Sequence, residues 1–128
     1  MSHTHAIVWI DHVEAHIIGI NPSDVETSVV KPAQAPRHLH NKRGSIASGH
    51  AAEDQHYYHE VAEALRGTKE ILIVGPSNAK INLIKHIHNH DHDMAANIIG
   101  VETVDHPSDA QLLAYARHYF KAADAMLA

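Results

Sequence analysis

The stretch Glu70–Lys80 constrains the fold more than any other part of the chain. It opens with four consecutive large aliphatic residues, Ile71 to Val74, of which three are β-branched. Such a run is typical of a strand that is buried on both faces. Gly75-Pro76 ends the strand, and Ser77 or Asn78 can then cap a helix with apolar residues at helical spacing: Ala79, Leu83, Ile84 and Ile87. A buried strand that leads directly into a helix favours an α/β fold, because each face of the strand needs a covering layer.

The turn after this strand is also a candidate anion site. The first backbone N–H groups of a helix have no partner within the helix, and they favour negative charge. Ser77, Asn78 and Lys80 lie at this turn, so we expect them to form a weak anion-binding site. The alternative is a turn that binds only water.

The remaining patterns predict the other elements. Residues 6–10, 15–20 and 27–31 have strand character, and the first two are expected to form a hairpin through Asp11–Glu14. A helix is expected over about 52–66, with Gly67 at its end and a buried stripe of Tyr58, Val61, Ala62 and Leu65. Downstream, the patterns predict a helical turn over 94–97, a strand over 98–104 and a final helix that begins at Pro107.

The resulting order, β-β-β-α-β-α-β-α, predicts an α/β fold with a ribonuclease-H-like mixed five-stranded sheet and helices on its faces. Right-handed crossovers would place the first and fourth strands side by side at the centre. We find no internal repeat and no linker, so residues 1–128 are expected to form a single domain.

Composition excludes several classes of protein. The chain has no cysteine, which excludes a disulfide scaffold and a thiol nucleophile and fits a reducing, cytoplasmic location. No apolar run approaches the roughly 20 residues of a membrane span, and the N-terminus lacks the regions of a signal peptide. The net charge of -5 argues against a general nucleic-acid coat, and nothing indicates DNA specificity.

The longest stretch without periodicity is also the most basic part of the chain. It covers about 32–51 and is expected to be a flexible loop. No acidic residue lies between Glu26 and Glu53, whereas four cations do: Lys31, Arg37, Lys42 and Arg43. Without those four charges the rest of the chain would carry -9. A basic loop on an acidic body can contact phosphates, although a solvated loop without a ligand has the same composition.

The 15 histidines suggest a second kind of site. His86, His88, His90 and His92 alternate with other residues, so on a continuous helix His86 would share a face with His90, and His88 with His92. Either pair could bind zinc or nickel, and His38, His40, His56 and His59 are further candidates. Surface histidines without a physiological metal explain the pattern equally well.

Several carboxylates suggest a metal-dependent hydrolase as another alternative. Two-metal phosphodiester cleavage needs several carboxylates that converge on two cations. Asp11 follows the first strand, and Glu60 or Glu63 on the first helix could be a second ligand. The central strand ends in Gly75-Pro76-Ser77 without an acid, so this set is incomplete and Asp11 is more simply a turn residue.

Three segments together resemble a known family. They are Arg37–Ser45, His56–Glu63 and Ile71–Lys80. In this order they resemble the middle domain of the eukaryotic and archaeal class I peptide-chain release factors and of Pelota, and the chain is similar to the stand-alone bacterial relatives called translational machinery proteins. The resemblance implies strands that lead into a basic loop, then a long helix, then a strand and a helix with a lysine. The order of the elements agrees with the family over nearly the whole chain, but the sequence similarity itself is confined to short motifs.

The chain departs from this family at the residues that release the peptide. Release factors carry Gly-Gly-Gln in the basic loop, where this chain has Asn41-Lys42-Arg43-Gly44-Ser45, and Gln34 and Gln55 only flank it. The resemblance therefore implies RNA binding without peptide release. The expected RNA-binding residues of the loop are Arg37, His38, His40, Asn41, Lys42, Arg43 and Gly44.

Three hypotheses follow. The leading one is a non-enzymatic, translation-associated protein that binds the ribosome or tRNA through the basic loop. The second is a metal-assisted hydrolase that acts on RNA or on an aminoacyl or peptidyl ester. The third is a histidine-rich metal-binding protein. An edge strand or the histidine tract could also mediate a homo-oligomer, but no pattern specifies one.

Overall fold

The computed structural model describes residues 4–32 and 55–127, and for residues 124–127 only the backbone. Its strands are β1 (His5–Ile10), β2 (Ala15–Ile20), β3 (Val25–Val30), β4 (Glu70–Gly75) and β5 (Ile98–Thr103). Its helices are α2 (Ala79–His90), α3 (His92–Ala95) and α4 (Asp109–Leu127), and residues 55–64 are also helical.

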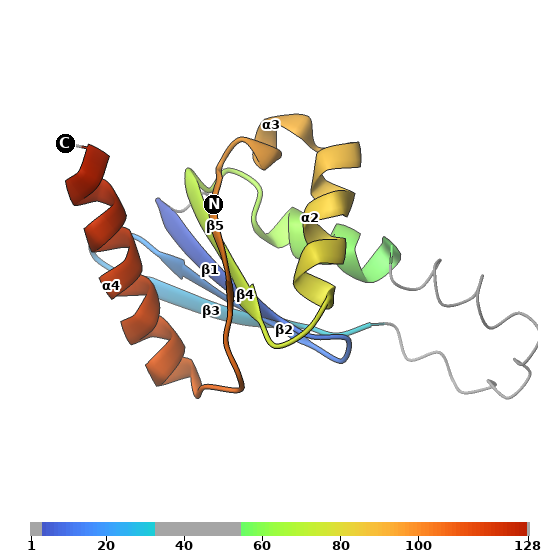
Figure 1. Cartoon of the computed structure of the whole chain (residues 1–128), viewed down its shortest axis with the longest axis horizontal. Coiled ribbons are helices and arrows are strands. Elements are labelled where there is room, and N and C mark those ends of the chain that lie inside the picture. The colour runs from blue at the N-terminus through green and yellow to red at the C-terminus, as the bar shows by residue number, and fades with distance from the viewer. Residues whose placement is uncertain (1–3, 33–54, 128) are drawn as a thin grey trace, which may run out of the picture.

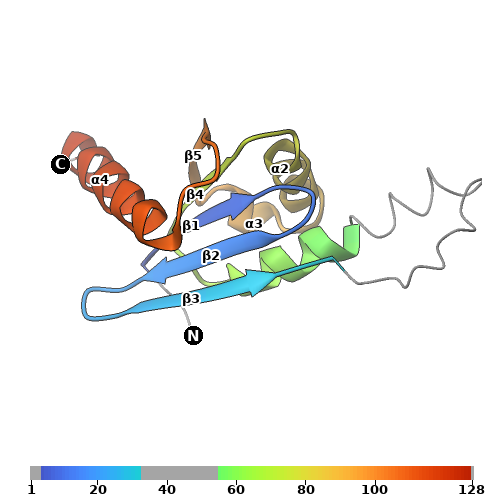
Figure 2. The ribbon, with the colours of Figure 1, turned by 90° about the horizontal axis from the view of Figure 1, so that it is seen from below.

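The five strands form one mixed sheet in the order β3-β2-β1-β4-β5. β1 and β2 are antiparallel, as are β2 and β3, whereas β1, β4 and β5 run parallel to one another. The predicted α/β fold with a ribonuclease-H-like sheet is therefore confirmed, and the first and fourth strands are neighbours. Figure 2 shows the three N-terminal strands side by side.

Two apolar cores cover the two faces of the sheet. α2 and the 55–64 helix lie against one face, and α4 lies against the other (Figure 1). Along β4 the side chains alternate between these cores: Ile71 and Ile73 face the first, Leu72 and Val74 the second. All four are fully buried, as the unbroken aliphatic run predicts.

The predicted buried stripe of the 55–64 helix is confirmed, since Tyr58, Val61, Ala62 and Leu65 are at most 1% exposed. Tyr57 is equally buried. Gly67 follows with a φ of 88°, a left-handed conformation that glycine adopts without strain. Residues 52–54, which the prediction included in this helix, lie outside the described part of the chain.

Three elements have boundaries that differ from the prediction by two residues. β3 begins at Val25 rather than at 27, and α3 covers His92–Ala95 rather than 94–97. α4 begins at Asp109 instead of Pro107, because Ser108 caps it. The Ser108 hydroxyl accepts a hydrogen bond from the Gln111 N–H at 3.1 Å, and the Gln111 side-chain oxygen accepts one from the Ser108 N–H at 2.9 Å. This reciprocal capping box fixes the helix start after Pro107.

Among the helices that the structure describes, none is long and apolar enough to cross a membrane.

Candidate functional site

The carboxyl ends of the parallel strands form the sheet edge at which ligands bind in many α/β proteins. Ile10 at the end of β1 pairs with Ala15, which also pairs with Val30 at the end of β3. The Tyr57 hydroxyl donates a hydrogen bond to the Asp11 carbonyl oxygen at 2.9 Å. Val30 and the start of the 55–64 helix therefore both lie beside the β1–β2 turn. The described residues on the two sides of 33–54 therefore both lie near this edge.

The predicted RNA-binding residues lie between those two ends, outside the described residues: Arg37, His38, His40, Asn41, Lys42, Arg43 and Gly44. Their roles stay predictions. Of the four cations in the acid-free stretch, the structure places Lys31, which is exposed directly after β3.

The turn between β4 and α2 lies at the same edge, since Gly75 ends β4 beside Ile10. Ser77 and Asn78 are exposed there, but neither side chain caps α2 with a hydrogen bond, so the predicted side-chain cap was wrong. Instead the Asn78 carbonyl oxygen accepts bonds from the N–H groups of Ile81 and Asn82, at 2.9 and 3.0 Å. Lys80 is buried, and its ammonium donates to the Ser77 carbonyl oxygen at 2.8 Å. The anion site formed by these three residues stays a prediction.

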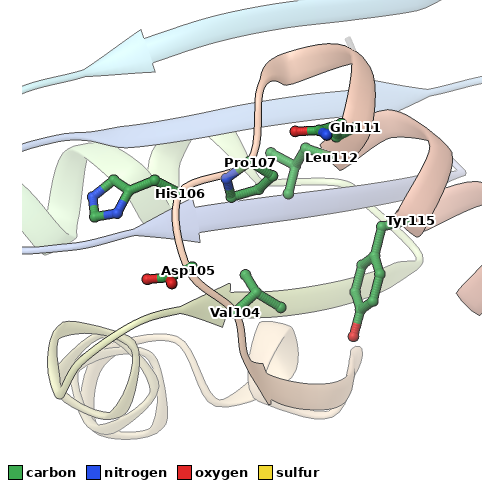
Figure 3. Close-up of a pocket in the computed structure, with 7 residues that line it drawn as sticks. All are labelled: Val104, Asp105, His106, Pro107, Gln111, Leu112 and Tyr115. Atoms are coloured by element: carbon green, nitrogen blue, oxygen red, sulfur yellow. The ribbon is translucent and has the colours of Figure 1, made fainter.

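A pocket of about 320 Å³ opens between the β5–α4 connection and the first turns of α4. Figure 3 shows its wall of Gln111, Leu112 and Tyr115 from α4. The connection forms the rest of the lining: Val104, Asp105, His106 and Pro107. The indole N–H of Trp9 in β1 donates to the Asp105 carbonyl oxygen at 2.6 Å and thereby holds this connection against the sheet.

Histidine–carboxylate pairs surround the Trp9 ring. His16 lies 3.0 Å from both Glu14 and Asp109, through its two ring nitrogens. The His106 ring packs 4.7 Å from the Trp9 ring, and its Nε2 lies 3.6 Å from Asp11. No sequence pattern predicts a role for Trp9, His16 or His106. Their grouping depends on the path of the β5–α4 connection across the sheet, which no local pattern encodes.

The three carboxylates considered for a hydrolase have separate contacts. Asp11 accepts backbone hydrogen bonds from Val13 and Glu14 at 2.8 and 2.9 Å, as a turn residue does. Glu60 lies 3.4 Å from His56. Glu63 pairs with Arg66 at 2.7 Å, and the hydrogen bond from this guanidinium lowers the pKa of the Glu63 carboxyl. The described part of the chain thus does not bring the three carboxylates to one point.

The histidine tract is divided by a break in the helix. α2 continues through His90, and Asp91, at φ −142° and ψ 65°, separates it from His92 in α3. His86 and His90 therefore share a helix face as predicted, whereas His88 and His92 are not on one helix. His86 is only 5% exposed, so it is not one of the surface histidines that the alternative interpretation of this tract expected. Across residues 4–32 and 55–127, no group of three or more histidine or carboxylate side chains could hold a metal ion.

His86 is packed between α2 and the 55–64 helix. Its Nδ1 lies 2.7 Å from the side-chain oxygen of Gln55, and its Nε2 is buried without a hydrogen-bond partner. Burial lowers the pKa of His86, and the nearby His90 and His59 lower it further, while Asp91 acts weakly in the other direction. At neutral pH His86 is therefore a neutral imidazole.

We expect the His86→Asn variant to lose part of the pH dependence of stability. Because the pKa of His86 is lowered in the folded state, the unfolded chain binds the proton more readily, and the free energy of unfolding falls as the pH drops below 6.5. The difference in the free energy of unfolding between wild type and variant should therefore change as the pH falls from 7.5 to 5.5. Urea unfolding at pH 7.5, 6.5 and 5.5 with a chelator present measures it. His88→Asn, at an exposed neighbour, should retain the wild-type dependence, and an equal dependence in all three proteins would contradict the prediction.

Comparisons with solved structures support the same fold. The Pelota proteins of Archaeoglobus fulgidus and Thermoplasma acidophilum align with TM-scores of 0.52 and 0.54, at 18% and 19% identity, over 84% and 85% of this chain. The archaeal translation termination factor aRF1 aligns with a TM-score of 0.55 at 16% identity over 95% of this chain. No protein-family model matches the sequence, and no curated protein is similar enough to count as a relative.

The chain spans 28%, 30% and 38% of the length of these three structures. At such identities the similarity shows a shared fold. It therefore defines the chain as an α/β domain with the fold of one part of the Pelota and aRF1 proteins.

Proposed function

We propose that this protein is a translation-associated binding module that contacts the ribosome or tRNA through its basic segment, the loop at about residues 32–51. The observation that carries the proposal is the meeting of Val30 and the 55–64 helix at the carboxyl edge of the sheet. The described residues on the two sides of the basic loop therefore lie near this edge.

The distribution of charge supports a polyanionic partner. The body around the segment is acidic, and several of its carboxylates are paired with histidines at the same edge. An acidic body repels phosphates, whereas the segment attracts them, so binding should be confined to the segment. The proposed contacts are to phosphates, which position the protein on the RNA but do not recognise its base sequence.

The fold supports a partner in translation. Pelota and the termination factor aRF1 share this fold. The resemblance of the three sequence segments to the middle domain of these proteins points in the same direction. Because the segment lacks Gly-Gly-Gln, the proposed role is binding without peptide release.

Sucrose-gradient sedimentation of cell lysates tests this role. We expect the protein to sediment with ribosomal particles at low salt and to be released as the salt concentration rises, because counterion release weakens phosphate contacts. Ribonuclease digestion of the lysate should shift it together with the monosome peak. Absence from every ribosomal and tRNA fraction, in growing and in stressed cells, would contradict the proposal.

A further inference from the structure

β3 is an open edge of the sheet. It is the outermost strand in the order β3-β2-β1-β4-β5, as Figure 2 shows. It pairs with β2 without a bulge along Val25–Val30, and five of these six residues are exposed. The strand contains no lysine and no proline, the residues that commonly keep a second strand away from an edge. A strand of this kind can pair through its backbone with another strand.

The opposite edge strand, β5, is less suited to such pairing. Between the pairs Ile71–Ile98 and Leu72–Gly100, β5 has one more residue than β4, which is Ile99. An extra residue of this kind bends the strand and disrupts the regular spacing of its backbone groups. Of the two edges, β3 is therefore the one with a regular row of backbone donors and acceptors.

The open side of β3 carries the backbone groups of every second residue. The Asn21 N–H donates to the Asp24 carbonyl oxygen at 2.9 Å, which makes this a hydrogen-bonded pair at the start of the β2–β3 ladder. Hydrogen-bonded and non-hydrogen-bonded pairs alternate along an antiparallel ladder. The next residue of β3 is therefore not bonded to β2, and the alternation continues along the strand. The N–H and C=O groups that point away from β2 belong to Val25, Thr27 and Val29.

We propose that β3 pairs antiparallel with β3 of a second copy of this chain, with the two Thr27 residues opposite each other. Val25 of each copy then lies opposite Val29 of the other. All three outward-facing residues of each strand form hydrogen-bonded pairs, with about six hydrogen bonds in total. The side chains of Val25 and Val29, which are 37% and 47% exposed in the single chain, cover each other across the new pair. The result is one continuous sheet across two copies.

The side chains of β3 favour this register. Opposite residues in a continuous sheet must lie on the same face, which leaves two neighbouring registers. The one centred on Glu26 would place two carboxylates opposite each other, and the one centred on Ser28 would leave Val25 opposite Lys31. With Thr27 at the centre, Glu26 lies opposite Ser28, whose hydroxyl can donate a hydrogen bond to the carboxylate. β3 is therefore complementary to itself, which favours a second copy over an unrelated strand as the partner.

Sedimentation velocity of the tag-free full chain tests the dimer. Because one short strand a side forms a small interface, we expect a reversible equilibrium with a Kd on the order of 10 µM. Thr27→Pro removes an N–H that points away from β2, so the fold should persist while the Kd rises by about tenfold or more. Val29→Lys should have the same effect, because it places a charge on the edge. Circular dichroism checks that both variants remain folded.

Val101→Lys is the matched control, since Val101 is 39% exposed and lies on the other edge strand, β5. Its Kd should stay within about twofold of the wild-type value. A wild-type chain that remains monomeric up to about 1 mM overturns the proposal. Equal effects of Val29→Lys and Val101→Lys also overturn it, as does dimerisation of Thr27→Pro with the wild-type Kd.

Single cysteines test the register, because the chain has no cysteine of its own. Opposite residues in a hydrogen-bonded antiparallel pair have Cα atoms about 5.5 Å apart, a distance that a disulfide can span. Under mild oxidation Thr27→Cys should therefore form a covalent dimer rapidly. Glu26→Cys and Ser28→Cys should crosslink rapidly with each other when mixed, but only slowly alone. Crosslinking of Ser28→Cys alone as fast as that of Thr27→Cys would overturn the proposed pairing.

Discussion

Replacement of Arg37, Lys42 and Arg43 by alanine should weaken RNA binding and flatten its dependence on salt, while the fold persists. Each cation that neutralises a phosphate on single-stranded RNA contributes about 0.7 to the slope of log K against log salt. Loss of three such contacts should lower the slope by about 2. Fluorescence anisotropy with labelled tRNA, between about 50 and 200 mM salt, measures both the affinity and the slope.

The control for this variant removes the same charge from the body. Lys69 precedes β4, whereas Lys85 lies on α2 and Lys121 on α4; all three are exposed, and none lies in the basic segment. Their triple alanine variant has the same net charge as the segment variant, so it reproduces any effect of overall charge. We expect its slope to equal that of the wild type. Equal losses in the two triple variants would contradict a binding role for the basic loop at about residues 32–51. Circular dichroism checks that both variants remain folded.

Gly75→Ala should be among the most destabilising single substitutions in the protein. A Cβ at Gly75 would collide with the carbonyl oxygen of Ile10 in the neighbouring central strand β1. A backbone oxygen of a strand that is paired on both sides cannot rotate away like a side chain, so both strands would have to shift. We expect a loss of about 3 kcal/mol, seen as a drop in the urea midpoint and a fall of about 10 °C in Tm.

Gly100→Ala is the matched comparison. A Cβ there would meet the hydroxyl end of the half-buried Tyr119 side chain, which can move aside. The loss should therefore stay at about 1 kcal/mol. Equal losses at the two positions would show that the close approach of β4 to β1 at Gly75 is not a rigid constraint.

The sheet was predictable because its signals are local and consistent. The aliphatic side chains of Ile71–Val74 can be buried only if a layer of structure covers each face of the sheet. The rule of right-handed crossovers then predicts the order of the strands. The helix boundaries were less predictable, because competing caps decide them. At the start of α4 the Ser108–Gln111 capping box prevailed over the preference of Pro107 for the first helical position.

The candidate sites show where local patterns fail. Spacing predicted correctly that His86 and His90 share a face, but not that His86 would be buried or would contact a residue of another helix. That contact arises from the packing of the 55–64 helix on α2, between residues 31 positions apart. The pairs around Trp9 likewise join β1, β2 and the start of α4. Such groupings depend on tertiary packing, which no window of sequence contains.

A photocrosslink from the basic segment tests the central claim most directly. A photoreactive amino acid in place of Lys42, activated in living cells, should capture ribosomal RNA or tRNA, whereas the same group in place of the exposed Lys121 should not. Crosslinks from position 42 that reach only the carboxylates of the protein's own body, or no RNA at all, would contradict a polyanion-binding role for this segment.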